Sequence, residues 1–98
     1  MEKIARIGDS IATGHGCDAT STIAGGSSNV FAEGVGVSRQ GDAIAPHTIE
    51  AGDQCVPHTA VINSGSSTVF ANGIPLARVD DSADAGKITS GASKTFSG

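Results

Sequence analysis

The sequence has almost no aromatic residues: among 98 residues there are three phenylalanines and neither tryptophan nor tyrosine. A chain of this length buries only about 60–65% of the surface of its unfolded state, so its core is small. No apolar run approaches about 18 residues, which argues against a membrane-spanning helix, and Met1-Glu2-Lys3 does not begin a signal-peptide pattern. We therefore expect a soluble domain made in the cytoplasm, exported only if another component carries it.

Basic residues are also scarce. Six lysines and arginines stand against ten acidic residues, which gives a net charge of −4. There is no basic patch with interleaved aromatic residues, so the sequence argues against a nucleic-acid partner. A chain with so few large apolar side chains usually needs a metal ion, a disulfide or a partner to stabilise it.

One segment of the chain is repeated almost three times. Residues 65–78 and 26–39 are close copies, GSSTVFANGIPLAR and GSSNVFAEGVGVSR. A third copy, GASKTFSG, occupies residues 91–98, and its missing second half has a counterpart in residues 3–6, KIAR. The phenylalanines fall at the same place in the three copies. Such a repeat predicts three related units, one of them assembled from both ends of the chain.

Each copy predicts a β-hairpin. Asn72-Gly73 is typical of the two-residue type I′ turn, which needs positive φ at both central positions, and Glu33-Gly34 is its equivalent in the first copy. Fourteen glycines favour turns and short strands, and no window has a helical period, so we expect little or no helix.

Pairing of residues 3–7 with the strand around Phe96 would close the chain on itself. The sequence therefore predicts a small three-sided all-β domain with approximate threefold symmetry. We expect the phenylalanines to point inward and the remaining segments to lie toward one end. A tandem meander without rotational symmetry is the alternative.

Between the repeats the chain makes three excursions, which are residues 12–22, 45–61 and 84–87. The first two carry every histidine and both cysteines, which are His15, Cys17, His47, Cys55 and His58. Two long loops that carry all of these metal-ligating side chains suggest a stabilising ion bound between them.

The spacing within these excursions suits a metal site. Cys55 and His58 can be presented to one ion by a single tight turn, and His47 precedes Cys55 by eight residues. His15 or Cys17 would complete a tetrahedral set. Imidazole and thiolate ligands suit zinc, and four protein ligands leave no open position for catalysis. Two alternatives stay open: ordinary surface or capping histidines, and a disulfide between Cys17 and Cys55, which a cytoplasmic origin disfavours.

These features resemble the PAAR-repeat proteins, the zinc-containing conical tips of type VI secretion spikes and contractile phage tails. The resemblance spans essentially the whole chain and depends on the Gly-Ser-Ser-x-Val-Phe-x-x-Gly segment and the Arg-x-Gly-Asp segment. It also depends on Pro75-Leu76-Ala77-Arg78, which stands where the family has Pro-Ala-Ala-Arg. The chain departs from the family at residues 36–39, Gly-Val-Ser-Arg, and at Asp80, where glycine is usual.

The resemblance implies a structural protein and not an enzyme. Residues 1–98 would form one tip domain that caps and sharpens a trimeric β-helical spike, VgrG-like or from a phage tail, with one tip per trimer. The tip would be made in the cytoplasm, assembled at the end of a phage tail or type VI spike, delivered outward with it, and touch the target-cell membrane transiently. The implied cofactor is one structural Zn²⁺, and on the family's pattern its ligands would be His15, His47, Cys55 and His58.

Two other functions remain as alternatives. The domain would be an adaptor that attaches effector cargo to a spike, or a small metal-dependent hydrolase. The sequence has no Gly-x-Ser-x-Gly elbow, His-Glu-x-x-His motif or Walker loop, which disfavours the hydrolase. Water as the fourth ligand of the metal would favour it again.

Overall fold

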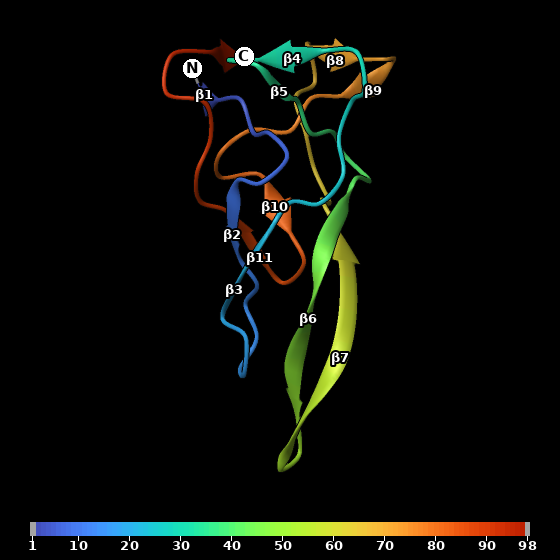
Figure 1. Ribbon diagram of the computed structural model, residues 1–98, viewed down its shortest axis with the longest axis vertical. Helices are drawn as coiled ribbons and strands as arrows, with labels where there is room; N and C mark the ends of the chain where they lie inside the picture. Colours follow the sequence, from blue (N-terminus) through green and yellow to red (C-terminus); the bar gives the residue numbers. More distant parts are fainter. Residues whose placement is uncertain (1, 98) are drawn as a thin grey trace.

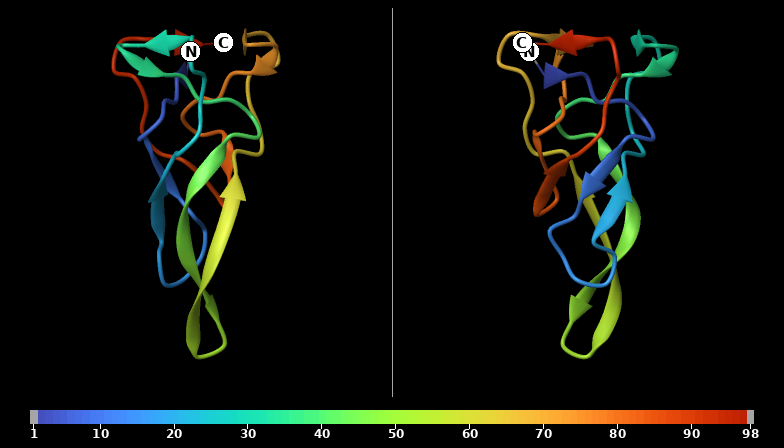
Figure 2. Two further views of the ribbon diagram at one scale, coloured as in Figure 1. Left: turned by 45° about the vertical axis from the view of Figure 1, so that its right-hand side comes forward. Right: turned by 90° about the vertical axis from the view of Figure 1, so that its left-hand side faces the viewer.

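The computed structural model describes residues 2–97, which form short β-strands and no helix. The molecule tapers from a wide end that holds both termini to a narrow end made by one long hairpin (Figures 1 and 2). Its principal extents are 41 × 24 × 21 Å. Within the described residues no helix is long and apolar enough to cross a membrane. The expected all-β conical domain is confirmed.

The wide end is built from the three repeats (Figure 1). Their short hairpins are β4 (Phe31–Ala32) with β5 (Val35–Gly36), β8 (Phe70–Ala71) with β9 (Ile74–Pro75), and β12 (Phe96–Ser97) with β1 (Glu2–Lys3). The last pairing joins the two ends of the chain, with Lys3 opposite Phe96, as the permuted third copy predicts. Gly98, the last residue of that copy, lies outside the described residues.

The turns of the two complete repeats have the predicted geometry. Glu33 and Gly34 have φ of 54° and 81°, and Asn72 and Gly73 have φ of 55° and 77°. Positive φ at both central positions is the requirement of a type I′ turn, whose twist matches that of the flanking strands. Local turn chemistry therefore sets these hairpins.

Three further hairpins form the tapering body. Their strands are β2 (Ser10–Ala12) with β3 (Thr20–Thr22), β6 (Ala43–Ala51) with β7 (Gln54–Val61), and β10 (Ser82–Ala83) with β11 (Gly86–Ile88). β11 also pairs with β2, and the bridges Ile23–Ile44 and Ile62–Ala83 join the remaining neighbours. The hairpins thus close around one axis, and β6–β7 extends well beyond the others (Figure 2).

A ring of main-chain hydrogen bonds marks the threefold relation. Ala5 N–H donates to Ala77 C=O at 3.0 Å, Ala77 N–H to Ser38 C=O at 2.9 Å, and Ser38 N–H to Ala5 C=O at 2.9 Å. All three residues are completely buried. Equivalent residues of the three repeats therefore bond one another in a cycle, and the meander without rotational symmetry is excluded.

An arginine–aspartate turn follows each residue of this ring. The Nε to Oδ2 distances in Arg6–Asp9, Arg39–Asp42 and Arg78–Asp81 are 3.2, 2.9 and 3.0 Å. The residue before each aspartate has positive φ: 91° at Gly8, 89° at Gly41 and 77° at Asp80. Asp80 keeps the turn although it stands where the other copies have glycine.

The core contains no phenylalanine. Its largest buried side chains are those of Ile11, Ile23, Ile44, Ile62 and Ile88. Phe31, Phe70 and Phe96 are 60%, 54% and 43% exposed, so the expectation that they point inward is wrong. Successive strand residues face opposite sides, and in β4 and β8 the alanine takes the inner side and is buried.

Candidate metal centre

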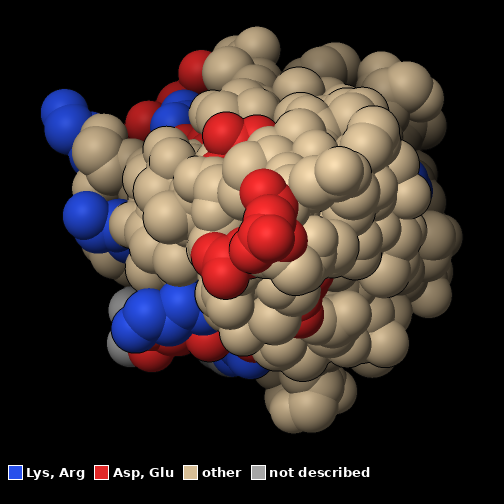
Figure 3. Space-filling model, turned by 90° about the horizontal axis from the view of Figure 1, so that it is seen from below, with Lys and Arg blue, Asp and Glu red and all other residues tan. Residues whose placement is uncertain are grey.

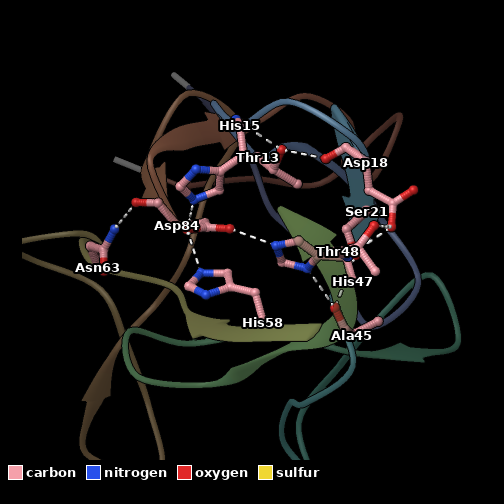
Figure 4. A network of polar contacts seen from close by, with 10 residues as sticks. All are labelled: Thr13, His15, Asp18, Ser21, Ala45, His47, Thr48, His58, Asn63 and Asp84. Carbon is pink, nitrogen blue, oxygen red and sulfur yellow. Dashed lines mark hydrogen bonds and ion pairs between the residues drawn. The ribbon is translucent and has the colours of Figure 1, made fainter. Parts of the chain in front are cut away.

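Three histidines gather around one aspartate below the threefold ring. Asp84 Oδ1 lies 2.8 Å from His15 Nε2 and 3.2 Å from His58 Nε2, and Asp84 Oδ2 lies 2.7 Å from His47 Nε2 (Figure 4). The four residues come from all three body hairpins. They therefore tie together elements that are far apart in the sequence.

The long hairpin supplies two of the histidines. His47 on β6 and His58 on β7 are direct cross-strand partners, next to a register shift between Ile44 and His47. Cross-strand partners present their side chains on the same face of the hairpin. Their ring centroids are 5.2 Å apart, and both rings contact Asp84.

His15 is placed by the loop between β2 and β3. Its N–H donates to the Thr13 hydroxyl, which in turn donates to the Asp18 carbonyl at 2.7 Å. Gly14 has φ of 77°, and a Cβ there would collide with the main-chain carbonyl of Ala85. Only glycine allows this close approach, which brings the loop against the turn that carries Asp84.

Asp84 occupies the turn of the shortest hairpin, between β10 and β11, with φ of 54°. Its carbonyl accepts a hydrogen bond from Asn63 Nδ2 at 2.8 Å, and its side chain is only 6% exposed. Counted from the arginine–aspartate turn, its counterparts are Ala12 and Ala45. The third excursion thus contributes one carboxylate where the others have methyl groups.

The electrostatics of the cluster are strongly coupled. The pKa of His47 is raised, first by the hydrogen bond of its Nδ1 to Ala45 C=O at 2.9 Å and then by Asp84. Burial acts to raise the pKa of Asp84, but hydrogen bonds from His15, His47 and His58 outweigh it and the pKa is lowered. The carboxylate is therefore ionised at neutral pH, with ring nitrogens facing it.

The donor set fits a first-row transition metal. One ring nitrogen each of His15 and His58 and one carboxylate oxygen of Asp84 lie within 4.8 Å of one another. Tetrahedral zinc, with bonds of about 2.0–2.1 Å, holds its ligands about 3.4 Å apart, so small side-chain movements would suffice. His47 Nδ1 donates to the Ala45 carbonyl, so Nε2, which contacts Asp84 Oδ2 at 2.7 Å, is the nitrogen that would bind a metal in place of a proton, the arrangement usual for histidine ligands.

Cys55 does not join this cluster, which corrects one predicted ligand. Cys17 and Cys55 form a disulfide with a Cα–Cα distance of 6.0 Å, the arrangement weighed above as an alternative. Cys55 also lies an odd number of residues before His58 on β7, so its side chain leaves the opposite face of the strand. Of the predicted set, the structure brings His15, His47 and His58 together around Asp84, and the group that could hold a metal comprises His15, His58 and Asp84.

Asp84 is absent from the predicted ligand set, because that set was chosen from the spacing of histidines and cysteines alone. A signal was present: aligned on the arginine–aspartate turns, the three excursions begin with Ala12, Ala45 and Asp84. The fold accepts alanine at this position in two of the three repeats, so the carboxylate in the third indicates a role other than folding.

The narrow end beyond the cluster is a two-stranded ribbon. The disulfide holds it to the first excursion, and Asp18 Oδ2 accepts hydrogen bonds from Thr48 N–H and Oγ1 at 2.8 and 2.9 Å. Seen from this end, most of the surface is uncharged, with acidic side chains near the centre and basic ones at one edge (Figure 3). The charges on this face are therefore few and of both signs.

The sequence matches no protein-family model, and no curated protein matches it. The features of the molecule that bear on function are its threefold geometry and the histidine–aspartate cluster. The cluster contains groups that bind metals and groups that transfer protons. Three of these groups, on His15, His58 and Asp84, lie close enough together that they could hold one metal ion.

Proposed function

We propose that this protein is the tip of a contractile injection machine: it caps a trimeric β-helical spike, VgrG-like or from a phage tail, and sharpens it. The observation that carries the proposal is the threefold arrangement of the wide end within a single chain. A trimeric spike ends in three identical strand edges. One chain with three similar hairpins can match all of them at once, which leaves no edge unpaired.

The exposed phenylalanines support this orientation. Phe31, Phe70 and Phe96 lie on the three hairpins of the wide end, and Val30 and Val69 beside them are also more than one-third exposed. Exposed apolar groups gathered at one end of a small domain mark an interaction surface. Because the groups repeat with the hairpins, they suit a partner with threefold symmetry.

The metal in this proposal is one structural Zn²⁺ held by His15, His47, His58 and Asp84. It would tie three hairpins together where the body is too thin for a hydrophobic core, and binding energy at such a site is folding energy. A rigid point serves passage through a target-cell membrane. The tip would be made in the cytoplasm and delivered outward with its spike, with no catalytic role and no nucleic-acid partner.

A metal-dependent hydrolase is the second candidate, and one observation favours it. The side chains of His15 and His58 are 26% and 29% exposed, so solvent reaches their side of the cluster. A metal that kept one water ligand there would resemble a catalytic zinc site. Four protein ligands, found by X-ray absorption or crystallography of the zinc-loaded protein, would end this candidate. An adaptor that attaches effector cargo would bind the spike through the same wide end and would differ only in carrying cargo.

Co-purification with a trimeric spike fragment from the same particle tests the proposal. Replacing Phe31, Phe70 and Phe96 together by serine should abolish the complex while the domain stays folded, because these side chains are exposed. Val61→Ser is the matched control, since Val61 is 44% exposed but lies on β7 in the body. Loss of binding in the control alone would contradict the proposed orientation.

A further inference from the structure

We propose that the Cys17–Cys55 disulfide and the metal centre are thermodynamically linked, so that reduction of the disulfide weakens metal binding and metal binding protects the disulfide. The inference rests on the metal site of the proposed function. It adds a redox dependence that neither the site nor the fold requires by itself.

The disulfide and the metal cluster join the same two elements. Cys17 is two residues after His15 in the β2–β3 loop, and Cys55 is three residues before His58 on β7. The Sγ–Sγ bond and a metal bridge from His15 to His58 would therefore each close nearly the same loop of chain. If the disulfide forms first, it holds His15 near His58. If the metal binds first, it holds Cys17 near Cys55.

Residues 14–17 make few main-chain hydrogen bonds, so apart from the disulfide they are held by the contact of His15 with Asp84 and by the bonds of the neighbouring Asp18 to Thr48. Within the described part of the chain, one hydrogen bond of the main chain reaches residues 14–17, from His15 N–H to the Thr13 hydroxyl at 3.2 Å. Cys17 has φ of 67°, a conformation that non-glycine residues seldom adopt. Release of Cys17 would let this loop, and His15 with it, move away from Asp84.

A reductant in solution can reach the disulfide because both cysteines are exposed. An external dithiol would supply two electrons and two protons, break the Sγ–Sγ bond to give two thiols, and become a disulfide itself. Part of the free energy of metal binding would then be used to order the β2–β3 loop, which lowers the affinity for the metal. Because coupling between two equilibria is reciprocal, the factor lost in metal affinity equals the factor gained in resistance to reduction when metal is bound.

The test measures zinc affinity of the full chain by competition with a chromophoric chelator. We expect the Cys17→Ser/Cys55→Ser double variant to bind Zn²⁺ at least about tenfold more weakly than the oxidised protein. Equal dissociation constants would overturn the linkage while leaving the metal site intact. If the oxidised protein binds no Zn²⁺, the metal site and the linkage both fail.

Two further measurements keep the linkage testable if the double variant does not fold. In glutathione buffers, saturating free Zn²⁺ should shift the thiol–disulfide equilibrium of the wild-type protein toward the disulfide at least about tenfold, and no shift would overturn the proposal. The single variant Cys17→Ser leaves Cys55 as a thiol. Its Co²⁺ complex should lack a thiolate charge-transfer band, whereas such a band with tighter binding would show that Cys55 replaces a ligand and would overturn the linkage.

Discussion

Asp84 and His47 lie 37 residues apart in the sequence, yet Asp84 Oδ2 and His47 Nε2 are 2.7 Å apart. The contact joins the turn of the shortest body hairpin to a buried position on the longest one. His15 and His58 meet the other oxygen of the same carboxylate. One aspartate is thus the meeting point of all three excursions.

Asp84→Asn should reduce zinc affinity more than about 100-fold, because loss of a second-shell partner alone typically costs 10–100-fold. The amide keeps the size of the side chain but removes the charge that faces three histidines. Chelator competition and metal content of the purified protein measure the effect. Asp53→Asn, an exposed carboxylate in the same molecule, is the control and should bind zinc like the wild type. Similar affinities in all three proteins would remove Asp84 from the site.

Asp80→Gly should stabilise the protein by about 0.5–1 kcal/mol, because Asp80 has φ of 77° and glycine adopts positive φ without steric cost. The exchange also removes the ion pair with Lys87, an exposed contact of small value. Lys87→Ala measures that contribution separately. Gly41→Ala should have the opposite effect, since φ is 89° and nothing lies within 4 Å of an added Cβ. Urea unfolding of the four proteins gives the comparison, and a destabilised Asp80→Gly would contradict it.

The acid sensitivity of the wide end should depend on Glu33. Its pKa is lowered, first by the hydrogen bond from Lys94 N–H at 2.7 Å and also by contacts with Ser93 and Thr95. A carboxyl group with a lowered pKa stabilises the fold above its ordinary pKa, and this contribution is lost as pH falls through the lowered value. Wild type should therefore lose more stability between neutral and acidic pH than Glu33→Gln. Parallel losses in urea unfolding midpoints would exclude the contribution.

Removal of the chain from residue 95 onward should unfold the domain. Thr95 C=O accepts a hydrogen bond from Ile4 N–H at 3.0 Å, and β12 is the only partner of β1 within residues 2–97. Terminal residues are usually dispensable, so a large effect is diagnostic. Phe96→Ala keeps the strand and removes an exposed ring, and it should change the melting temperature little. An unchanged melting temperature after truncation would contradict closure of the body by its termini.

The sequence predicted the structure correctly wherever the structure follows from local chemistry or from the repeat. Asn72-Gly73 and Glu33-Gly34 determine their turns through the backbone alone, and the permuted third copy required the two termini to pair. These features need no knowledge of what lies across the molecule. The hairpins and the threefold body were predictable for this reason.

Features that depend on spatial neighbours were less predictable. A two-residue strand such as Phe31–Ala32 has no pattern long enough to show which face is buried, and in the folded protein the small residue takes the buried side. Cys17 pairs with Cys55 because the fold brings the β2–β3 loop to β7, a proximity that residue spacing does not show. Asp84 meets the histidines from the turn of a different hairpin, a contact that the order of residues in the sequence does not show.

The mass of the complex between this protein and a trimeric spike fragment tests the central claim most directly. Three non-identical hairpins in one chain predict one tip per spike trimer, measured by native mass spectrometry. The complex should also survive high salt, since apolar and main-chain contacts are little screened. Three tips per trimer would mean that the repeats do not match the symmetry of the spike, and would contradict the account.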